Sequence, residues 1–258
     1  MPHTPVTDDT SAIAKGPAAE VSTAPFPTEL GQLQVSENWV TLGFDQARPC
    51  LSSAVVNGGL VNATRWINLK VSGDQAEAAH CPTATVAALC QQQQWPEEPA
   101  PVAMMTAASM DSLRVRFAEV CGEQLAVLVT TGLANARRAG DRAEYRQLSD
   151  HCNEVGTINI AVVTSATLST AVMAECMMTA TEAKTAVLQK HGVISPVSGE
   201  LATGTGTDSL AVFGGHGQQA AFAGKHTIFG EVLARLVIEG IDAAAYKAAP
   251  TIAKVAIS

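Results

Sequence analysis

Short runs rich in valine, isoleucine, alanine and threonine alternate with helical patterns along this chain, and that alternation limits the fold more than any other feature. Glycine, asparagine or serine bounds each run, which is typical of β-strands. Strands interspersed with helices predict an α/β or α+β domain, in which helices cover layers of a mixed β-sheet whose strand order stays open. The six predicted strands are Cys50–Asn57, Thr64–Val71, Val102–Ala107, Leu125–Thr131, Thr157–Thr164 and Leu201–Phe213.

The clearest helix is predicted over Thr170–His191, where apolar residues recur at helical spacing and Gly192 follows as a stop signal. A last helix is predicted over about Thr227 to Lys247 on the same grounds. Three weaker helical patterns cover Thr83–Gln92, Met110–Val120 and Leu133–Leu148, the last interrupted at Gly140.

Composition and charge exclude several classes of protein. A length of 258 residues provides a substantial core, and a hydrophobic content of 47% excludes disorder for the bulk of the chain. The net charge of −8 argues against a general nucleic-acid binder, which needs a basic surface. No apolar run reaches the roughly 18 residues of a membrane span. We therefore expect a globular protein without nucleic-acid partners. Whether it forms a homo-oligomer stays open.

The first 28 residues are rich in proline, alanine, threonine and serine and show no apolar period. They predict a disordered arm over residues 1–28, followed by one domain over residues 29–258. The arm lacks the apolar and basic regions of a signal peptide, so a cytoplasmic location is expected. The six cysteines have no metal-ligand spacing and are interpreted as mostly buried thiols.

Small polar residues gather at the ends of the predicted strands. Hydroxyls and amides from several strand ends are predicted to line one hydrogen-bonding cavity, although threonine also favours strands and asparagine caps turns. Standard catalytic motifs such as HExxH and GxSxG are absent, and the TGTGTD segment leads into a strand, which argues against a nucleotide loop. The strand-end residues are Ser52, Ser53, Asn57, Thr106, Thr130, Thr131, Asn135, Thr157, Asn159, Thr203, Thr205, Thr207 and Asp208.

Six sequence blocks, taken in order, resemble the adenosylcobinamide amidohydrolase family of corrinoid salvage over about residues 35 to 245. The resemblance implies hydrolysis of one side-chain amide of adenosylcobinamide, which yields adenosylcobyric acid and aminopropanol. It also implies that complete cobamides with unsuitable lower ligands are accepted by some members. The blocks are LSSAVVNGG (51–59), TTGLANARRAGD (130–141), GTINI (156–160), TEAKTAVL (181–188), ATGTGTD (202–208) and AGKHTIFGE (223–231).

Amide hydrolysis needs a base or nucleophile, an oxyanion donor and an acid for the leaving amine. Asp208 is the leading candidate for the base or for the group that orients the nucleophile, because it ends a loop of glycine and threonine; the alternative is a turn aspartate. Lys184 falls in the apolar stripe of its helix, where an ammonium must pair, snorkel or lose its proton. We predict that it acts in the site, or alternatively forms a structural ion pair.

There are two further catalytic candidates, one near Lys184 in the sequence and one at the start of the last helix. His226 precedes that helix, where the dipole favours a neutral imidazole that suits a base or donor. Glu182 lies two residues from Lys184, on a more polar helix face. Each has a structural alternative: His226 as a residue at the entry of the helix, and Glu182 as a surface carboxylate.

Substrate contacts are predicted from residues that donate and accept hydrogen bonds, as the corrin's peripheral amides require. The predicted substrate-binding residues are Ser52, Ser53, Asn57, Gly58, Thr131, Asn135, Asp141, Asn159, Thr205 and Thr207.

No cofactor of the protein's own is predicted, because cobalt would arrive inside the corrinoid substrate. A metal-independent hydrolase is favoured; the alternative is a divalent ion held by Asp141, Asp208, His226 and Glu231, although their spacing is not that of a zinc site. A corrinoid-binding or carrier protein without catalysis is the competing function, and a different amidohydrolase or an acyltransferase is a third.

Overall fold

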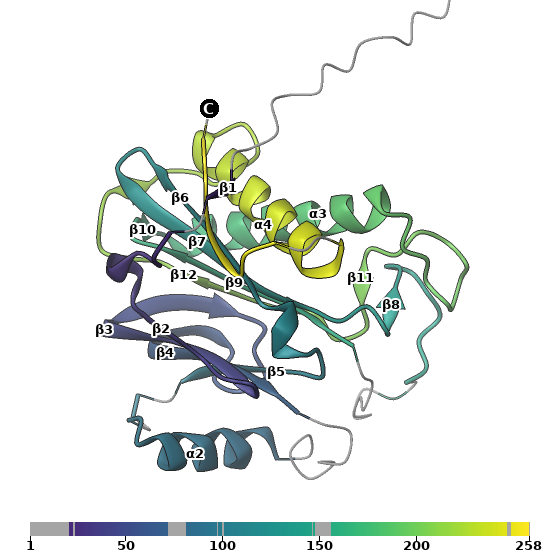
Figure 1. Ribbon diagram of the computed structural model, residues 1–258, viewed down its shortest axis with the longest axis horizontal. Coiled ribbons are helices and arrows are strands. Elements are labelled where there is room, and N and C mark those ends of the chain that lie inside the picture. The colour runs from purple at the N-terminus through teal and green to yellow at the C-terminus, as the bar shows by residue number, and fades with distance from the viewer. Residues whose placement is uncertain are drawn as a thin grey trace, which may run out of the picture.

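One β-sheet, folded onto itself and covered by helices, forms the body of the protein (Figure 1). The computed structural model describes residues 21–22, 24–71, 81–96, 98–99, 101–145, 147, 156–246 and 249–257. This mixed sheet with covering helices confirms the predicted fold class. Among these residues, no helix is long and apolar enough to cross a membrane.

The strand order of the described sheet is β1-β14-β6-β7-β9-β12-β3-β4-β5, with β2 added beside β3. Most neighbours are antiparallel, but β9 and β12, β14 and β6, and β4 and β5 pair in parallel. Its strands are β1 (Val21–Ser22), β2 (Gln32–Val35), β3 (Trp39–Ser52), β4 (Gly59–Lys70), β5 (Val102–Thr106), β6 (Arg114–Val120), β7 (Glu123–Thr131), β9 (Ile158–Thr164), β12 (Ser209–Phe213) and β14 (Ile252–Val255).

The long strands β3 and β4 carry the sheet from one layer into the other. Their pairing shifts register between Gly43 and Arg48, and such an irregularity bends a strand pair. The inner faces of the two layers then enclose one apolar core, to which Trp66 of β4 and Phe213 of β12 both belong. Phe44 packs on Phe213 with ring centroids 5.1 Å apart, so the bend is held by buried aromatic area.

Helices cover both outer faces of this folded sheet (Figure 1). α3 (Thr170–Lys190) and α4 (Ile228–Tyr246) pack on β7, β9 and β12 and share a large apolar core with them. α2 (Pro82–Gln93) covers β4 and β5 on the other side. α3 begins at Ser169, whose side chain caps the Val172 N–H, and Gly192 with a φ of 63° ends it as predicted.

Four predicted elements differ in the structure. The predicted strand Cys50–Asn57 is a strand only over Cys50–Ser52, the end of β3, and continues as irregular chain with a turn. The described part of Leu133–Leu148 contains no helix but the two-residue strand β8 (Ala136–Arg137) and irregular chain. Met110–Val120 is a short 3-10 helix, η2 (Met110–Ser112), followed by β6, because β7 and β14 pair with this segment on both sides. The predicted strand Leu201–Phe213 is divided into β11 (Gly204–Thr205) and β12 by a turn at Gly206 and Thr207.

Part of the segment predicted as an arm contacts the body of the protein; residues 1–20 and 23 lie outside the described residues. β1 pairs with β14, and η1 (Thr28–Leu30) buries Leu30 completely. Phe26 packs edge-to-face on Phe117 at 6.3 Å. A few apolar residues in a sequence rich in proline and alanine are enough to dock this segment, since the core already offers them an apolar surface.

Phe26→Ala is expected to lower the free energy of unfolding by about 1–3 kcal/mol, less than a fully buried phenylalanine because the ring is half-buried. Urea denaturation measures this change. Val35→Ala, at a side chain that is 49% exposed on β2, is the control and should shift stability by no more than about 0.5 kcal/mol. Equal stabilities for the two variants would show that the segment around Phe26 does not support the core.

Candidate functional site

An open groove of about 710 Å³ lies at the end of the molecule where α3, β8 and β11 meet. We call it the α3 groove. One wall comes from α3 and from the loop around β11, and the other from the irregular chain after β8. Its lining includes Lys184, Thr205, Asp208, Arg137, Arg138 and Asp141.

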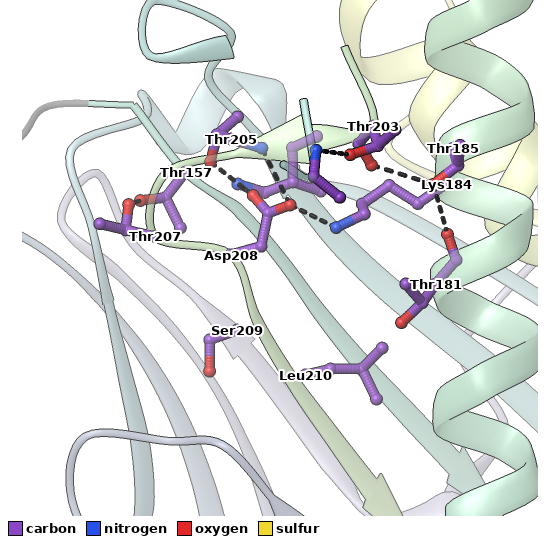
Figure 2. A network of polar contacts seen from close by, with 12 residues as sticks. Thr157, Thr181, Lys184, Thr185, Thr203, Thr205, Thr207, Asp208, Ser209 and Leu210 are labelled. Atoms are coloured by element: carbon purple, nitrogen blue, oxygen red, sulfur yellow. Dashed lines mark hydrogen bonds and ion pairs between the residues drawn. The ribbon is translucent and has the colours of Figure 1, made fainter. Parts of the chain in front are cut away.

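Lys184 and Asp208 form an ion pair in this groove (Figure 2). The Lys184 Nζ atom contacts the Asp208 Oδ2 atom, and the two side chains are only 11% and 16% exposed. Lys184 is placed there by the buried face of α3, as the stripe predicts. Because a buried ammonium is costly without a counter-charge, the pair explains how a lysine is retained among apolar residues.

Four donors hold the Asp208 carboxylate. The Oδ1 atom accepts hydrogen bonds from the Ile158 N–H at 3.0 Å and from the Thr205 hydroxyl. The Oδ2 atom accepts from the Thr205 N–H at 3.0 Å and from Lys184. Contacts from β9, β11 and α3 therefore fix the orientation of this one side chain.

Gly204 leaves the space that the ion pair occupies. A Cβ atom at this position would lie 2.4 Å from Asp208 Oδ2 and 2.8 Å from Lys184 Nζ. Glycine is needed here for close approach of the backbone to the two charges.

The opposite wall carries arginines that the chain itself orients. Arg137 Nη2 contacts Glu144 Oε1 at 2.7 Å, and Arg138 Nη1 donates to the Leu201 carbonyl at 2.8 Å. The Arg138 N–H also donates to Asp141 at 2.8 Å. Hydrogen bonds from the Ser195 and Ser198 hydroxyls and from this N–H hold the pKa of Asp141 below its usual value, so Asp141 is a charged brace of the loop.

Other residues predicted to bind substrate lie outside the groove lining. The Thr207 hydroxyl bonds the Thr157 hydroxyl at 2.6 Å, and the Asn135 carbonyl accepts from Gly206 at 3.0 Å, so both support the TGTGTD turn. Thr131 and Asn159 are buried at the ends of β7 and β9. The Asn159 amide donates to Asn68 Oδ1 at 2.8 Å.

The predicted residues of the LSSAVVNGG block meet the start of β12, just after Asp208. The Ser53 hydroxyl lies 3.3 Å from that of Ser209 and accepts from the Leu210 N–H at 3.1 Å. Ser52 is buried at the end of β3. Asn57 and Gly58 form the tight turn that follows, where a Cβ on Gly58 would lie 2.3 Å from the Ala54 oxygen.

His226 and Glu182 do not line the α3 groove. His226 is exposed beside Phe222, and Glu182 forms an exposed ion pair with Lys225. Glu231 Oε1 lies 3.9 Å from Arg235 Nη1, four residues further along α4. Within the described residues, no three histidine, cysteine, aspartate or glutamate side chains lie close enough to hold a metal ion.

None of the five cysteines that the structure describes lines the groove. Cys50, Cys90 and Cys176 are buried, as predicted, whereas Cys81 and Cys121 are exposed and Cys152 lies outside the described residues. Burial raises the pKa of Cys50 and of Cys176 to about 12, which keeps both thiols protonated.

Sequence reasoning missed the arginine wall of the groove. Three arginines within six residues, Arg137, Arg138 and Arg142, are unusual in a chain of net charge −8. That signal was available, but the expected helix over Leu133–Leu148 concealed it. Gly204 was also missed, because its role depends on a contact between distant segments.

Fold and groove together define an α+β protein with a ligand-sized cleft that contains a lysine–carboxylate pair. Residues 26–251 match the family model described as adenosylcobinamide amidohydrolase. The chain belongs to the adenosylcobinamide amidohydrolase family.

Two relatives match part of the chain. An uncharacterized protein of Methanocaldococcus jannaschii is 35% identical over 158 residues, which are 56% of this chain and 62% of that protein. The adenosylcobinamide amidohydrolase of Methanosarcina mazei is 30% identical over 156 residues, which are 57% of this chain and 66% of that enzyme. The chain thus spans just under two thirds of the length of each relative.

A solved structure of a Pyrococcus horikoshii protein is a distant likeness. The superposition covers 86% of this chain and 82% of the Pyrococcus horikoshii chain, with 12% sequence identity and a TM-score of 0.39.

Gly204→Ala is expected to displace the ion pair and to lower the free energy of unfolding by about 1–3 kcal/mol, since the added methyl group would overlap two charged atoms, one of which belongs to a carboxylate fixed by hydrogen bonds from Ile158 and Thr205. Urea denaturation measures the loss. Gly214→Ala is the matched control, because its Cβ would meet the flexible end of Met173 at 3.2 Å. If Gly204→Ala were as stable as Gly214→Ala, the close packing around the pair would not constrain the site.

Proposed function

We propose that this protein hydrolyses the amide that joins aminopropanol to the corrin ring in adenosylcobinamide. The products are adenosylcobyric acid and aminopropanol, and cobamides with unsuitable lower ligands are further substrates. The observation that carries this proposal is the Lys184–Asp208 pair, set in an open groove of a chain whose family is named for this reaction. To test the proposal, the protein is incubated with adenosylcobinamide, and chromatography then shows whether the corrinoid has been converted to adenosylcobyric acid.

The groove suits one arm of a large substrate. Its volume of about 710 Å³ falls in the range of ligand sites, and its open side leaves a bulky macrocycle outside. The aminopropanol side chain enters beside Lys184, while the arginine wall and the threonine hydroxyls face the polar groups around the amide.

The pair supplies the acid–base chemistry that amide cleavage needs. The Lys184 ammonium has N–H groups beyond the one on Asp208, so it can protonate the departing nitrogen. Asp208 accepts the proton of the attacking group. Neither role requires a metal, and we propose a metal-independent hydrolase with no cofactor of its own and a cytoplasmic location.

Lys184→Met and Asp208→Asn are each expected to lower turnover of adenosylcobinamide by at least about 10²-fold, because each removes one half of the acid–base pair. Lys184→Met also leaves a carboxylate without its counter-charge and costs about 1–3 kcal/mol of stability. Turnover is followed by chromatography, and stability by urea denaturation of the same sample.

Lys254→Met and Glu119→Gln, at exposed side chains of β14 and β6, are the controls and should keep full turnover. Near-normal turnover in a folded Asp208→Asn variant would reduce Asp208 to a brace of its loop. If the unaltered protein binds corrinoid but releases no aminopropanol, it is a carrier and the proposed enzymatic function is refuted.

Exhaustive treatment with EDTA is expected to leave turnover unchanged, since the acid and the base are both side chains of this chain. The assay compares treated protein, untreated protein and treated protein with divalent ions added back. Activity that is lost with EDTA and restored by one divalent ion would overturn the metal-independent mechanism.

A further inference from the structure

We propose that the Thr205 hydroxyl is the nucleophile of the reaction, so that hydrolysis passes through an ester between Thr205 and the corrin carboxyl group. This inference rests on the proposed function and adds a covalent intermediate to it. It assigns a third reacting group to the site beside Lys184 and Asp208.

The geometry that points to Thr205 is a chain of three groups in one groove (Figure 2). The Thr205 Oγ1 atom donates to Asp208 Oδ1, and Asp208 Oδ2 contacts Lys184 Nζ. A nucleophile bonded to its base, with the base oriented by a third group, is the arrangement that activates a hydroxyl. All three residues line the α3 groove, so a substrate amide there reaches the hydroxyl and the ammonium together.

Neighbouring threonines make different contacts. The Thr185 hydroxyl donates to the backbone carbonyls of Thr181 and Thr203, at 3.0 Å and 2.9 Å. The Thr203 hydroxyl accepts from the Ala139 N–H at 2.8 Å. The Thr207 hydroxyl donates to the Gly156 carbonyl at 3.0 Å. These hydroxyls hold loops together, whereas that of Thr205 contacts a carboxylate already paired with an ammonium.

Thr205 is also held firmly by its backbone. Its N–H donates to Asp208 Oδ2 at 3.0 Å, and β11 pairs it with Ala136. The residue is half-buried and lines the groove. Preorganisation of this kind lowers the entropic cost of bringing the oxygen to the carbonyl carbon.

In the first step, the Thr205 oxygen attacks the amide carbon and its proton passes to Asp208. The C–N bond breaks as Lys184 donates a proton to the nitrogen, and aminopropanol leaves as an amine. The enzyme now holds an ester, a protonated Asp208 and a neutral Lys184.

In the second step, water attacks the ester carbon and gives a proton to the neutral Lys184. The C–O bond to Thr205 breaks, and Asp208 returns its proton to that oxygen. The corrin carboxylic acid leaves, and all three side chains regain their starting protonation states. No oxidant, reductant or further reactant enters either step.

The first test is a partition experiment with hydroxylamine. The unaltered protein is given adenosylcobinamide and, separately, the corresponding amide of aminoethanol, each with hydroxylamine present. If both substrates form one shared ester, the ratio of hydroxamate to free acid is the same for the two. A ratio that depends on the leaving amine, or the absence of hydroxamate, overturns the covalent route.

The second test compares substitutions at Thr205. Thr205→Val, which keeps the shape but lacks the hydroxyl, should lose at least about 10²-fold in turnover, and Thr205→Ser should stay within about tenfold. Thr85→Val on α2, which lies away from the groove, is the matched control, since its hydroxyl donates to Cys81 O at 3.0 Å within its own helix turn. Turnover of Thr205→Val within threefold of the parent overturns the proposal.

The two tests separate this inference from the proposed function. If the unaltered protein releases no aminopropanol, the proposed function fails. If it does release aminopropanol but shows unequal partition ratios or a fully active Thr205→Val, only the covalent route fails. Partitioning is measured on the unaltered protein, so it decides the question even if Thr205→Val folds poorly.

Discussion

The ion pair between Lys184 and Asp208 is the interaction on which the rest of the site depends. A lysine on the buried face of α3 would destabilise the helix packing without a counter-charge, and Asp208 supplies it from the adjoining loop between β11 and β12. The same contact orients Asp208 toward Thr205 and leaves no room for a side chain at position 204. One electrostatic constraint therefore fixes α3, the loop before β12 and the proposed reacting groups relative to one another.

The folded sheet supplies the frame for this pair. Its bend between Gly43 and Arg48 encloses a core between two layers, while the outer face of β9 and β12 remains available to α3. α3 connects these parallel neighbours, so Lys184 of the helix and Asp208 at the start of β12 meet at one end of the sheet. The proposed reaction would thus take place at an edge of a rigid scaffold, where loops are open to a bulky substrate.

Sequence patterns predicted the elements with strong local signals and failed where tertiary pairing decided the outcome. Thr170–His191 and the last helix carry clear apolar stripes with a glycine stop or a polar start, and both exist. The segment Met110–Val120 was expected to be helical, but β14 and β7 pair with most of it as β6, in which even Arg116 is buried. The loop after β8 has helix-forming alanines and arginines, yet contacts to Leu201 and Thr203 hold it open as a groove wall.

By itself, the sequence determined the fold class, the two main helices, the family and the prominence of Lys184 and Asp208. These follow from periodicity, from ordered blocks and from a charge placed in an apolar stripe. Only the tertiary structure decided that the partner of Lys184 is Asp208, that Thr205 bonds the same carboxylate, and that His226 and Glu182 lie outside the groove. The reason is physical. Lys184 lies in the helix that connects β9 to β12, and Asp208 lies just before β12. The distance between these two side chains depends on how the helix packs on the sheet, which no local sequence pattern encodes.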